Sequence, residues 1–211
     1  MHALLEQLAG YKLIPVIVIE SADDAELLAD ALLAGGLPVA EVTFRTAAAA
    51  EALRRMRAVP ELLVGAGTVL NAEQARAAVA CGAQFLVSPG CAPEVIEYGR
   101  ECGLPVIPGV ATPTEIQTAL AHGVEVLKFF PAETLGGVAA LKALSAPFPS
   151  VRFIPTGGIS AENMGAYLAL KNVLAVGGSW MVRSELMRAG QFDAVSELVS
   201  DALQRVHALT N

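Results

Sequence analysis

The sequence repeats one unit, in which a short run of apolar and β-branched residues is followed by a stretch with helical spacing. The runs, each of them an expected strand, span 13–19, 37–44, 62–66, 84–87, 104–107, 124–129, 151–154 and 173–176. Strands that alternate with helices pair in parallel, because each helix returns the chain to the start of the next strand. Eight such units in 211 residues predict an α/β protein, a (β/α)8 TIM barrel that spans residues 1–211 as a single domain. A doubly wound open sheet is the alternative.

Local signals mark the ends of the expected helices. Four helical stretches are followed by a glycine that can take the left-handed conformation at a helix end: Gly36, Gly82, Gly103 and Gly123. The expected N-caps are Ser21, Asn71, Thr112 and Ser160. A short extra N-terminal helix is expected over 3–9, and apolar spacing from Phe192 to Leu209 predicts an amphipathic closing helix.

Composition excludes several classes of protein. The formal net charge of −7 argues against a general nucleic-acid binder, which needs clustered Lys and Arg. The chain is 54% hydrophobic and so is not disordered, yet no apolar run reaches the length of about 18 residues that a transmembrane helix needs. The N-terminus lacks the basic region of a signal peptide, and three cysteines are too few for a disulfide framework, so we expect a cytoplasmic protein without a membrane partner. Three scattered histidines predict no metal site.

Lys128 is the residue that most strongly indicates chemistry. In a barrel the active site lies at the C-terminal ends of the strands, where Lys128 shares a strand face with Val126. Burial disfavours the charged form of a lysine, and a neutral amine is a nucleophile suited to Schiff-base chemistry. The alternative is a lysine at a strand end that extends into solvent.

Glu41 and Arg45 lie on one face of the second expected strand, with Glu41 deeper and Arg45 nearer the rim. A buried carboxylate close to a lysine can transfer protons. An arginine can hold a substrate carboxylate through two parallel hydrogen bonds. An internal ion pair with a structural role is the alternative for Glu41.

Two glycine-rich segments accompany the seventh and eighth expected strands. Gly157 and Gly158 are expected to open the helix after the seventh strand, and Gly177, Gly178 and Ser179 to follow the eighth. Free backbone N–H groups at the start of a helix favour anions. Loops after strands seven and eight form the recurrent phosphate site of these barrels, so the sequence predicts a phosphate site here.

Seven segments together resemble the 2-keto-3-deoxy-6-phosphogluconate (KDPG) aldolases, class I enzymes of the Entner–Doudoroff pathway, some of which also cleave 4-hydroxy-2-oxoglutarate (KHG). The segments are 41–46, 65–70, 87–90, 109–115, 127–132, 155–159 and 176–180. They occur in the family's order between about Ile14 and Val182, which is most of the chain.

The resemblance implies a cofactor-free (β/α)8 enzyme that is usually a homotrimer. Lys128 would form the Schiff base, and Glu41 would be the acid–base residue. Arg45 and Thr68 would bind the pyruvyl carboxylate. The residues that would line the pocket or hold the phosphate are Pro89, Phe130, Thr156, Gly157, Gly158, Gly178 and Ser179.

We therefore expect a carbon–carbon lyase that cleaves KDPG, a phosphorylated keto acid, to pyruvate and glyceraldehyde 3-phosphate. An aldolase that prefers KHG or the 6-phosphogalactonate epimer is the near alternative. A phosphosugar isomerase or epimerase would use the same phosphate loops but would not need an inward lysine. A non-catalytic binding protein would leave Lys128 and Glu41 as buried charges without a purpose.

Overall fold

The computed structural model describes residues 2–210, and Met1 and Asn211 lie outside the described residues. Helices and strands alternate along the chain as the sequence predicts. The strands are β1 (Leu13–Ile17), β2 (Val39–Thr43), β3 (Leu63–Gly67), β4 (Leu86–Val87), β5 (Val106–Ile107), β6 (Gly109–Val110), β7 (Val126–Phe129), β8 (Arg152–Pro155) and β9 (Val176–Gly178). The helices are α1 (Ala3–Tyr11), the 3-10 turn η1 (Ala22–Asp24), α2 (Ala25–Ala34), α3 (Ala49–Arg57), α4 (Ala72–Ala80), α5 (Pro93–Glu101), α6 (Pro113–Ala121), α7 (Gly137–Ser145), α8 (Met164–Leu168), α9 (Ser184–Arg188) and α10 (Phe192–Thr210).

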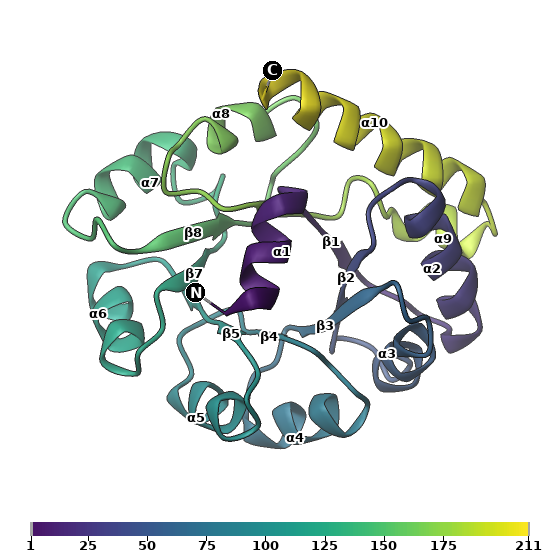
Figure 1. Cartoon of the computed structure of the whole chain (residues 1–211), viewed down its shortest axis with the longest axis horizontal. Helices are drawn as coiled ribbons and strands as arrows, with labels where there is room; N and C mark the ends of the chain where they lie inside the picture. The colour runs from purple at the N-terminus through teal and green to yellow at the C-terminus, as the bar shows by residue number, and fades with distance from the viewer. Residues whose placement is uncertain (1, 211) are drawn as a thin grey trace.

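All the paired strands run parallel to one another. A six-stranded sheet has the order β5-β4-β3-β2-β1-β9, and a three-stranded sheet has the order β6-β7-β8. Figure 1 shows the strands at the centre of the molecule, curled into a half-barrel, with helices α2 to α10 around their outer side. The parallel α/β fold is confirmed. The arrangement does not match the doubly wound alternative, in which helices cover both faces of an open sheet.

The strand ends shift by one or two residues from the expected bounds, and two strands differ by more than that. The fifth expected strand, 104–107, is followed by a second short strand after Pro108. Pro108 has no backbone N–H to donate, and it separates β5, which pairs with β4, from β6, which pairs with β7. The last expected strand, 173–176, lies further along the chain, because β9 begins at Val176. Gly177 and Gly178 belong to β9 and pair with β1, so they do not follow the strand as predicted.

Most of the predicted helix caps are present. Thr112 and Glu115 form a capping box at the start of α6, and the side chain of Asn71 accepts a hydrogen bond from the Gln74 N–H at 2.9 Å. Ser21 caps η1. Ser160 does not cap a helix, because its hydroxyl accepts from the Glu162 N–H and α8 begins only at Met164. The Gly157-Gly158 segment is therefore separated from α8 and does not open a helix as predicted.

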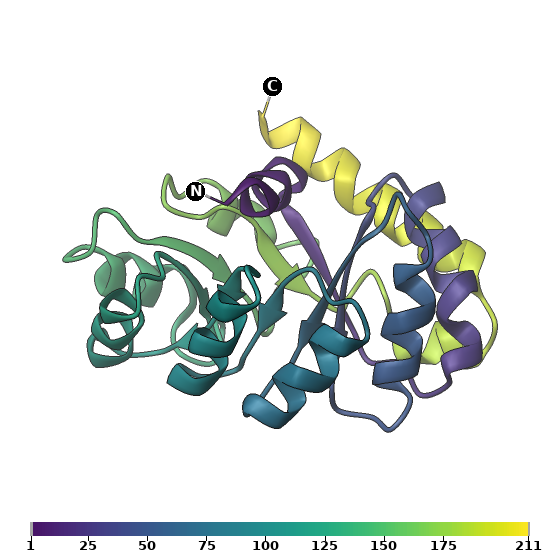
Figure 2. The ribbon, with the colours of Figure 1, turned by 60° about the horizontal axis from the view of Figure 1, so that its bottom comes forward.

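The two terminal helices were both expected, and both pack against the core. α1 lies at one end of the strands (Figures 1 and 2), where Leu5 and Leu8 are buried. α10 packs on α2 with Val195 and Val199 buried. None of the helices within residues 2–210 combines the length and the apolar character that a membrane crossing requires.

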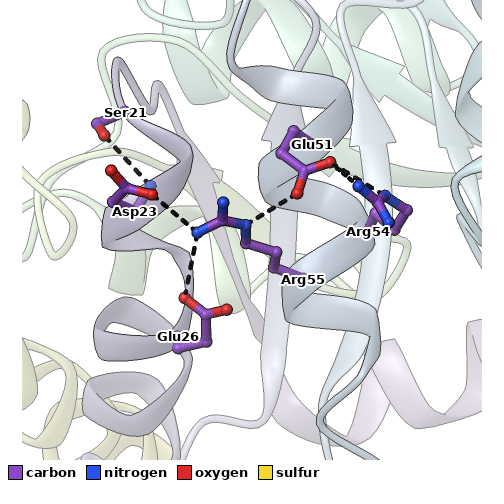
Figure 3. A network of polar contacts seen from close by, with 6 residues as sticks. All are labelled: Ser21, Asp23, Glu26, Glu51, Arg54 and Arg55. Carbon is purple, nitrogen blue, oxygen red and sulfur yellow. Dashed lines mark hydrogen bonds and ion pairs between the residues drawn. The ribbon is translucent and has the colours of Figure 1, made fainter.

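A surface network joins the first two strand–helix connections (Figure 3). Arg55 of α3 binds Asp23 of η1 and Glu51 of its own helix, each at 2.9 Å. Hydrogen bonds from Arg55 and Arg54 lower the pKa of Glu51. In the connection that follows β2, the Thr46 hydroxyl donates to the Ile19 carbonyl at 2.6 Å. Exposed ion pairs contribute little to the free energy of unfolding, so we expect this network to add little stability.

Candidate active site

Two cavities within residues 2–210 differ in position, and the predicted site residues line the smaller of these two. A cavity of about 490 Å³ lies where β5, β7 and β8 begin, beside α1, and none of the predicted residues lines it. A cavity of about 330 Å³ lies where the strands end. Its wall includes ten predicted residues: Arg45, Thr68, Pro89, Lys128, Phe130, Thr156, Gly157, Gly158, Gly178 and Ser179. Reactive side chains, rather than volume, make the smaller cavity the candidate active site.

Lys128 and Glu41 meet inside the fold, although 87 positions separate them in the sequence. Lys128 lies in β7 and is 5% exposed, and Glu41 lies in β2 and is 2% exposed. The Lys128 Nζ is 3.3 Å from the Glu41 Oε1 and 5.2 Å from the centroid of the Phe130 ring. The alternative of a lysine that extends into solvent is therefore wrong. This buried pair places a nucleophile and a proton acceptor within hydrogen-bonding distance of each other. Lys128 lines the cavity, whereas Glu41 is not among the residues that line it.

Gly67, at the end of β3, makes room for Glu41. A Cβ atom at Gly67 would lie 2.3 Å from the Glu41 Oε1 and 2.7 Å from its Cγ. No side chain larger than hydrogen fits there without moving the carboxylate. We did not predict this role from the sequence. The only signal was a glycine inside a strand, which indicates that another group approaches the backbone closely.

Arg45 and Thr68 are placed to bind an anion at the cavity. Within residues 2–210, neither the Arg45 guanidinium nor the Thr68 hydroxyl has an internal polar partner. Thr68 has a φ of +56°, which is unfavourable for a β-branched residue. The Val69 N–H bonds to the Val87 carbonyl at 3.0 Å and anchors the residue that follows Thr68. Such a backbone conformation is common at ligand sites, where the surrounding structure imposes it.

The two glycine segments meet at the same cavity. Gly157 and Gly158 both have positive φ, at +99° and +75°, and Gly178 and Ser179 lie beside them at the end of β9. Thr156, at the end of β8, forms a bridge to Gly177. The backbone N–H groups of Gly158 and Ser179 donate to no acceptor within residues 2–210, whereas the Gly157 N–H is on the side of Thr156 that bridges to Gly177. Unpaired N–H groups around a cavity favour an anion such as phosphate.

Pro89 lines another part of the cavity wall and brings no charged group to it. Its carbonyl oxygen lies so close to Gly109 that a Cβ there would be 2.1 Å away. The neighbouring Ser88 hydroxyl donates to the Gly90 carbonyl at 2.7 Å, which closes this turn. Among the residues that the structure describes, no three His, Cys, Asp or Glu side chains gather as metal ligands.

Comparisons with known proteins agree with this geometry. The sequence model of the KDPG and KHG aldolase family matches residues 4–198. The 2-dehydro-3-deoxy-phosphogluconate aldolase of Treponema pallidum is 49% identical over 98% of this chain and 99% of its own. The KHG/KDPG aldolase of Escherichia coli K12 is 46% identical over 90% of each chain.

A solved structure extends the likeness to three dimensions. The KDPG aldolase of Legionella pneumophila has a TM-score of 0.89 and 43% identity, covering 93% of this chain and 96% of its own. In that crystal structure pyruvate was captured at low pH as a covalent carbinolamine intermediate. Sequence and fold agree over almost the whole length, and this chain belongs to the KDPG and KHG aldolase family.

Proposed function

We propose that this protein is a class I aldolase that cleaves KDPG to pyruvate and glyceraldehyde 3-phosphate, with Lys128 as the Schiff-base residue. The observation that carries the proposal is the buried contact of 3.3 Å between the Glu41 Oε1 and the Nζ of Lys128, which lines the cavity. The same cavity offers Arg45 and unpaired N–H groups for the two negatively charged ends of the substrate. The family relatives named as KDPG aldolases support the reaction.

The reaction begins when the neutral amine of Lys128 attacks the ketone carbon, C2, of the substrate. The resulting carbinolamine loses water and leaves a protonated imine. Glu41 takes the proton of the C4 hydroxyl, either directly or through a water molecule. The C3–C4 bond then breaks, its electron pair passes into the imine to give an enamine, and the aldehyde leaves. Protonation of the enamine at C3 and hydrolysis of the imine release pyruvate and restore the Lys128 amine.

The other residues position the two ends of the substrate. Arg45 and Thr68 bind the carboxylate next to the ketone, which is supported by the absence of an internal polar partner for either side chain within residues 2–210. Gly157, Gly158 and Ser179 hold the phosphate, which is supported by the unpaired N–H groups of Gly158 and Ser179. With both ends held, the bond that breaks is fixed relative to Lys128 and Glu41. Pro89, Phe130, Thr156 and Gly178 line the pocket.

The phosphate-binding groups favour a phosphorylated substrate over KHG. The name of the Escherichia coli relative shows that one family member carries both activities, so KHG is the second candidate substrate. Comparison of kcat/KM for KDPG, its galactonate epimer and KHG ranks the three. We expect KDPG to rank first, and a higher value for KHG would contradict the phosphate assignment.

The proposal extends to the fold and the assembly. We infer that the two sheets are parts of one closed (β/α)8 barrel, and that residues 1–211 form a single domain. The parallel bridges Phe153–Val173 and Thr156–Gly177, which connect β8 toward β9, and the single residue between β5 and β6 support closure. A homotrimer in the cytoplasm is carried over from the family resemblance, and sedimentation velocity tests the trimer.

Trapping of the imine tests the reaction. The protein is incubated with pyruvate and sodium borohydride, which reduces an imine to a stable secondary amine, and peptides are examined by mass spectrometry. We expect one carboxyethyl adduct, on the peptide that contains Lys128, while exposed Lys142 and Lys171 serve as internal controls and stay unmodified. A folded protein without an adduct at Lys128 would overturn the proposal and favour an isomerase or a binding role.

A further inference from the structure

Three consecutive peptide groups at the end of β8 are held by their carbonyl oxygens. The Thr156 carbonyl accepts from the Ala132 N–H at 2.8 Å, and the Gly157 carbonyl accepts from the Glu133 N–H at 3.1 Å. The Gly158 carbonyl accepts from the Asn163 Nδ2 at 3.0 Å. Two of the three donors are backbone N–H groups that follow β7, and the third is the side-chain amide of Asn163.

This anchoring aims the N–H groups of the same peptides. In a planar trans peptide the N–H and the C=O point in opposite directions. The N–H groups of Gly157, Gly158 and Ile159 therefore point away from their anchors and toward the cavity that these residues line. The Gly158 and Ile159 N–H groups donate to no acceptor within residues 2–210, whereas the Gly157 N–H is on the side of Thr156 that bridges to Gly177. The carbonyl bonds thus orient two free donors at the cavity: the Gly158 N–H, which we assigned to the phosphate, and the Ile159 N–H next to it.

A buried tyrosine holds Glu133, the residue whose side chain packs against Gly158. Tyr167 of α8 is fully buried, and its hydroxyl donates to the Glu133 Oε1. A Cβ at Gly158 would lie 2.6 Å from the Glu133 Cβ, so the Glu133 side chain packs directly against the glycine segment. Burial and the hydrogen bond to Glu133 raise the pKa of Tyr167, so the phenol stays a neutral donor.

From these contacts we infer that Tyr167, acting through Glu133, and Asn163 are positioning residues that give the enzyme its preference for phosphorylated over non-phosphorylated keto acids. The inference rests on the proposed function. None of the three side chains lines the cavity. Glu133 and Asn163 contact Gly158, and Tyr167 contacts Glu133, so their effect falls on the phosphate end of the substrate and not on Lys128.

The test compares two substrates that share the imine chemistry but differ in the phosphate. Tyr167→Phe removes only the hydroxyl, and Asn163→Ala removes the anchor of Gly158. Tyr98→Phe, on α5 and away from the cavity, is the matched control. For Tyr167→Phe we expect KM for KDPG to rise about tenfold, the effect of losing one well-placed hydrogen bond, while kcat/KM for KHG stays within about twofold of wild type. Inhibition of KHG cleavage by inorganic phosphate should weaken by a similar factor. Tyr98→Phe should change none of these values.

The outcomes separate the inference from the proposed function. An equal loss on KDPG and KHG would mean a general structural role and would overturn the inference, as would no change on either substrate. If Tyr167→Phe does not fold, Asn163→Ala decides by the same ratio of kcat/KM values. A wild-type protein that cleaves neither substrate and forms no borohydride adduct would overturn the proposed function, and the inference with it.

Discussion

Replacement of Gly67 by alanine tests how closely the reaction depends on the place of Glu41. The new Cβ would lie 2.3 Å from the Glu41 Oε1 and 2.7 Å from its Cγ, whereas ordinary contact begins at 3.4 Å. The carboxylate must therefore move by about 1 Å. Because the Cγ is in the middle of the side chain and Glu41 is almost completely enclosed, rotation of the carboxylate alone does not relieve the clash.

The expected effect is on kcat. Glu41 lies 3.3 Å from the Lys128 Nζ, so a displacement of about 1 Å is a large fraction of the contact that the proton transfer uses. A misplacement of this size costs about 100-fold in rate. Steady-state cleavage of KDPG, followed by reduction of the released pyruvate with lactate dehydrogenase and NADH, measures kcat and KM. We expect kcat to fall about 100-fold and KM to change little, because Arg45 and the glycine segments are untouched.

Gly65→Ala is the matched control in the same strand. A Cβ at Gly65 would meet the Phe85 ring at 2.3 Å, which is the same degree of overlap, but with a core side chain in place of Glu41. Overpacking of this kind destabilises a protein by about 1–3 kcal/mol. Thermal unfolding should therefore report a loss of stability for Gly65→Ala, with the kcat of the folded protein retained. The reasoning fails if folded Gly67→Ala keeps kcat within about threefold of wild type, or if both variants lose kcat equally.

Two further predictions concern Arg45 and the reactivity of two cysteines. Arg45→Lys keeps the charge but removes the planar pair of donors, so we expect KM for KDPG to rise about tenfold with kcat nearly unchanged, and an unchanged KM would remove Arg45 from carboxylate binding. Burial and the nearby Glu115 raise the pKa of Cys91, which lowers its thiolate fraction at any given pH. Because iodoacetamide alkylates the thiolate, exposed Cys102 should be labelled first near pH 7, and labelling of Cys91 should need a more alkaline pH, as measured by peptide mass spectrometry. Equal labelling of both cysteines near pH 7 would contradict this order.

Local signals predicted the elements of the fold better than their ends. The capping box of Thr112 and Glu115 depends on residues three positions apart, so the sequence contains the whole interaction. The end of β9 depends on pairing with β1, and glycine carries no side-chain pattern that would reveal it. For the same reason Gly157 and Gly158 resembled a helix start, although α8 begins only after the turn that Ser160 and Asn163 close.

The site follows the same division between local and long-range information. Strand alternation was enough to predict that Lys128 and Glu41 point inward, because each prediction depends only on which face of its own strand the residue occupies. A buried charge is costly unless it is paired, so each of these residues indicates that an opposite charge lies nearby, and the two inward charges identify one another. No comparable signal marks Gly67, Glu133 or Tyr167. A glycine, an exposed carboxylate and a buried aromatic residue are each ordinary at these positions. Their roles arise from contacts with other elements: Gly67 with Glu41 of the adjacent strand, and Tyr167 with Glu133 across 34 positions of sequence. Residues that carry charge into the interior can therefore be found from one sequence, whereas the neutral groups that hold them in place require the fold.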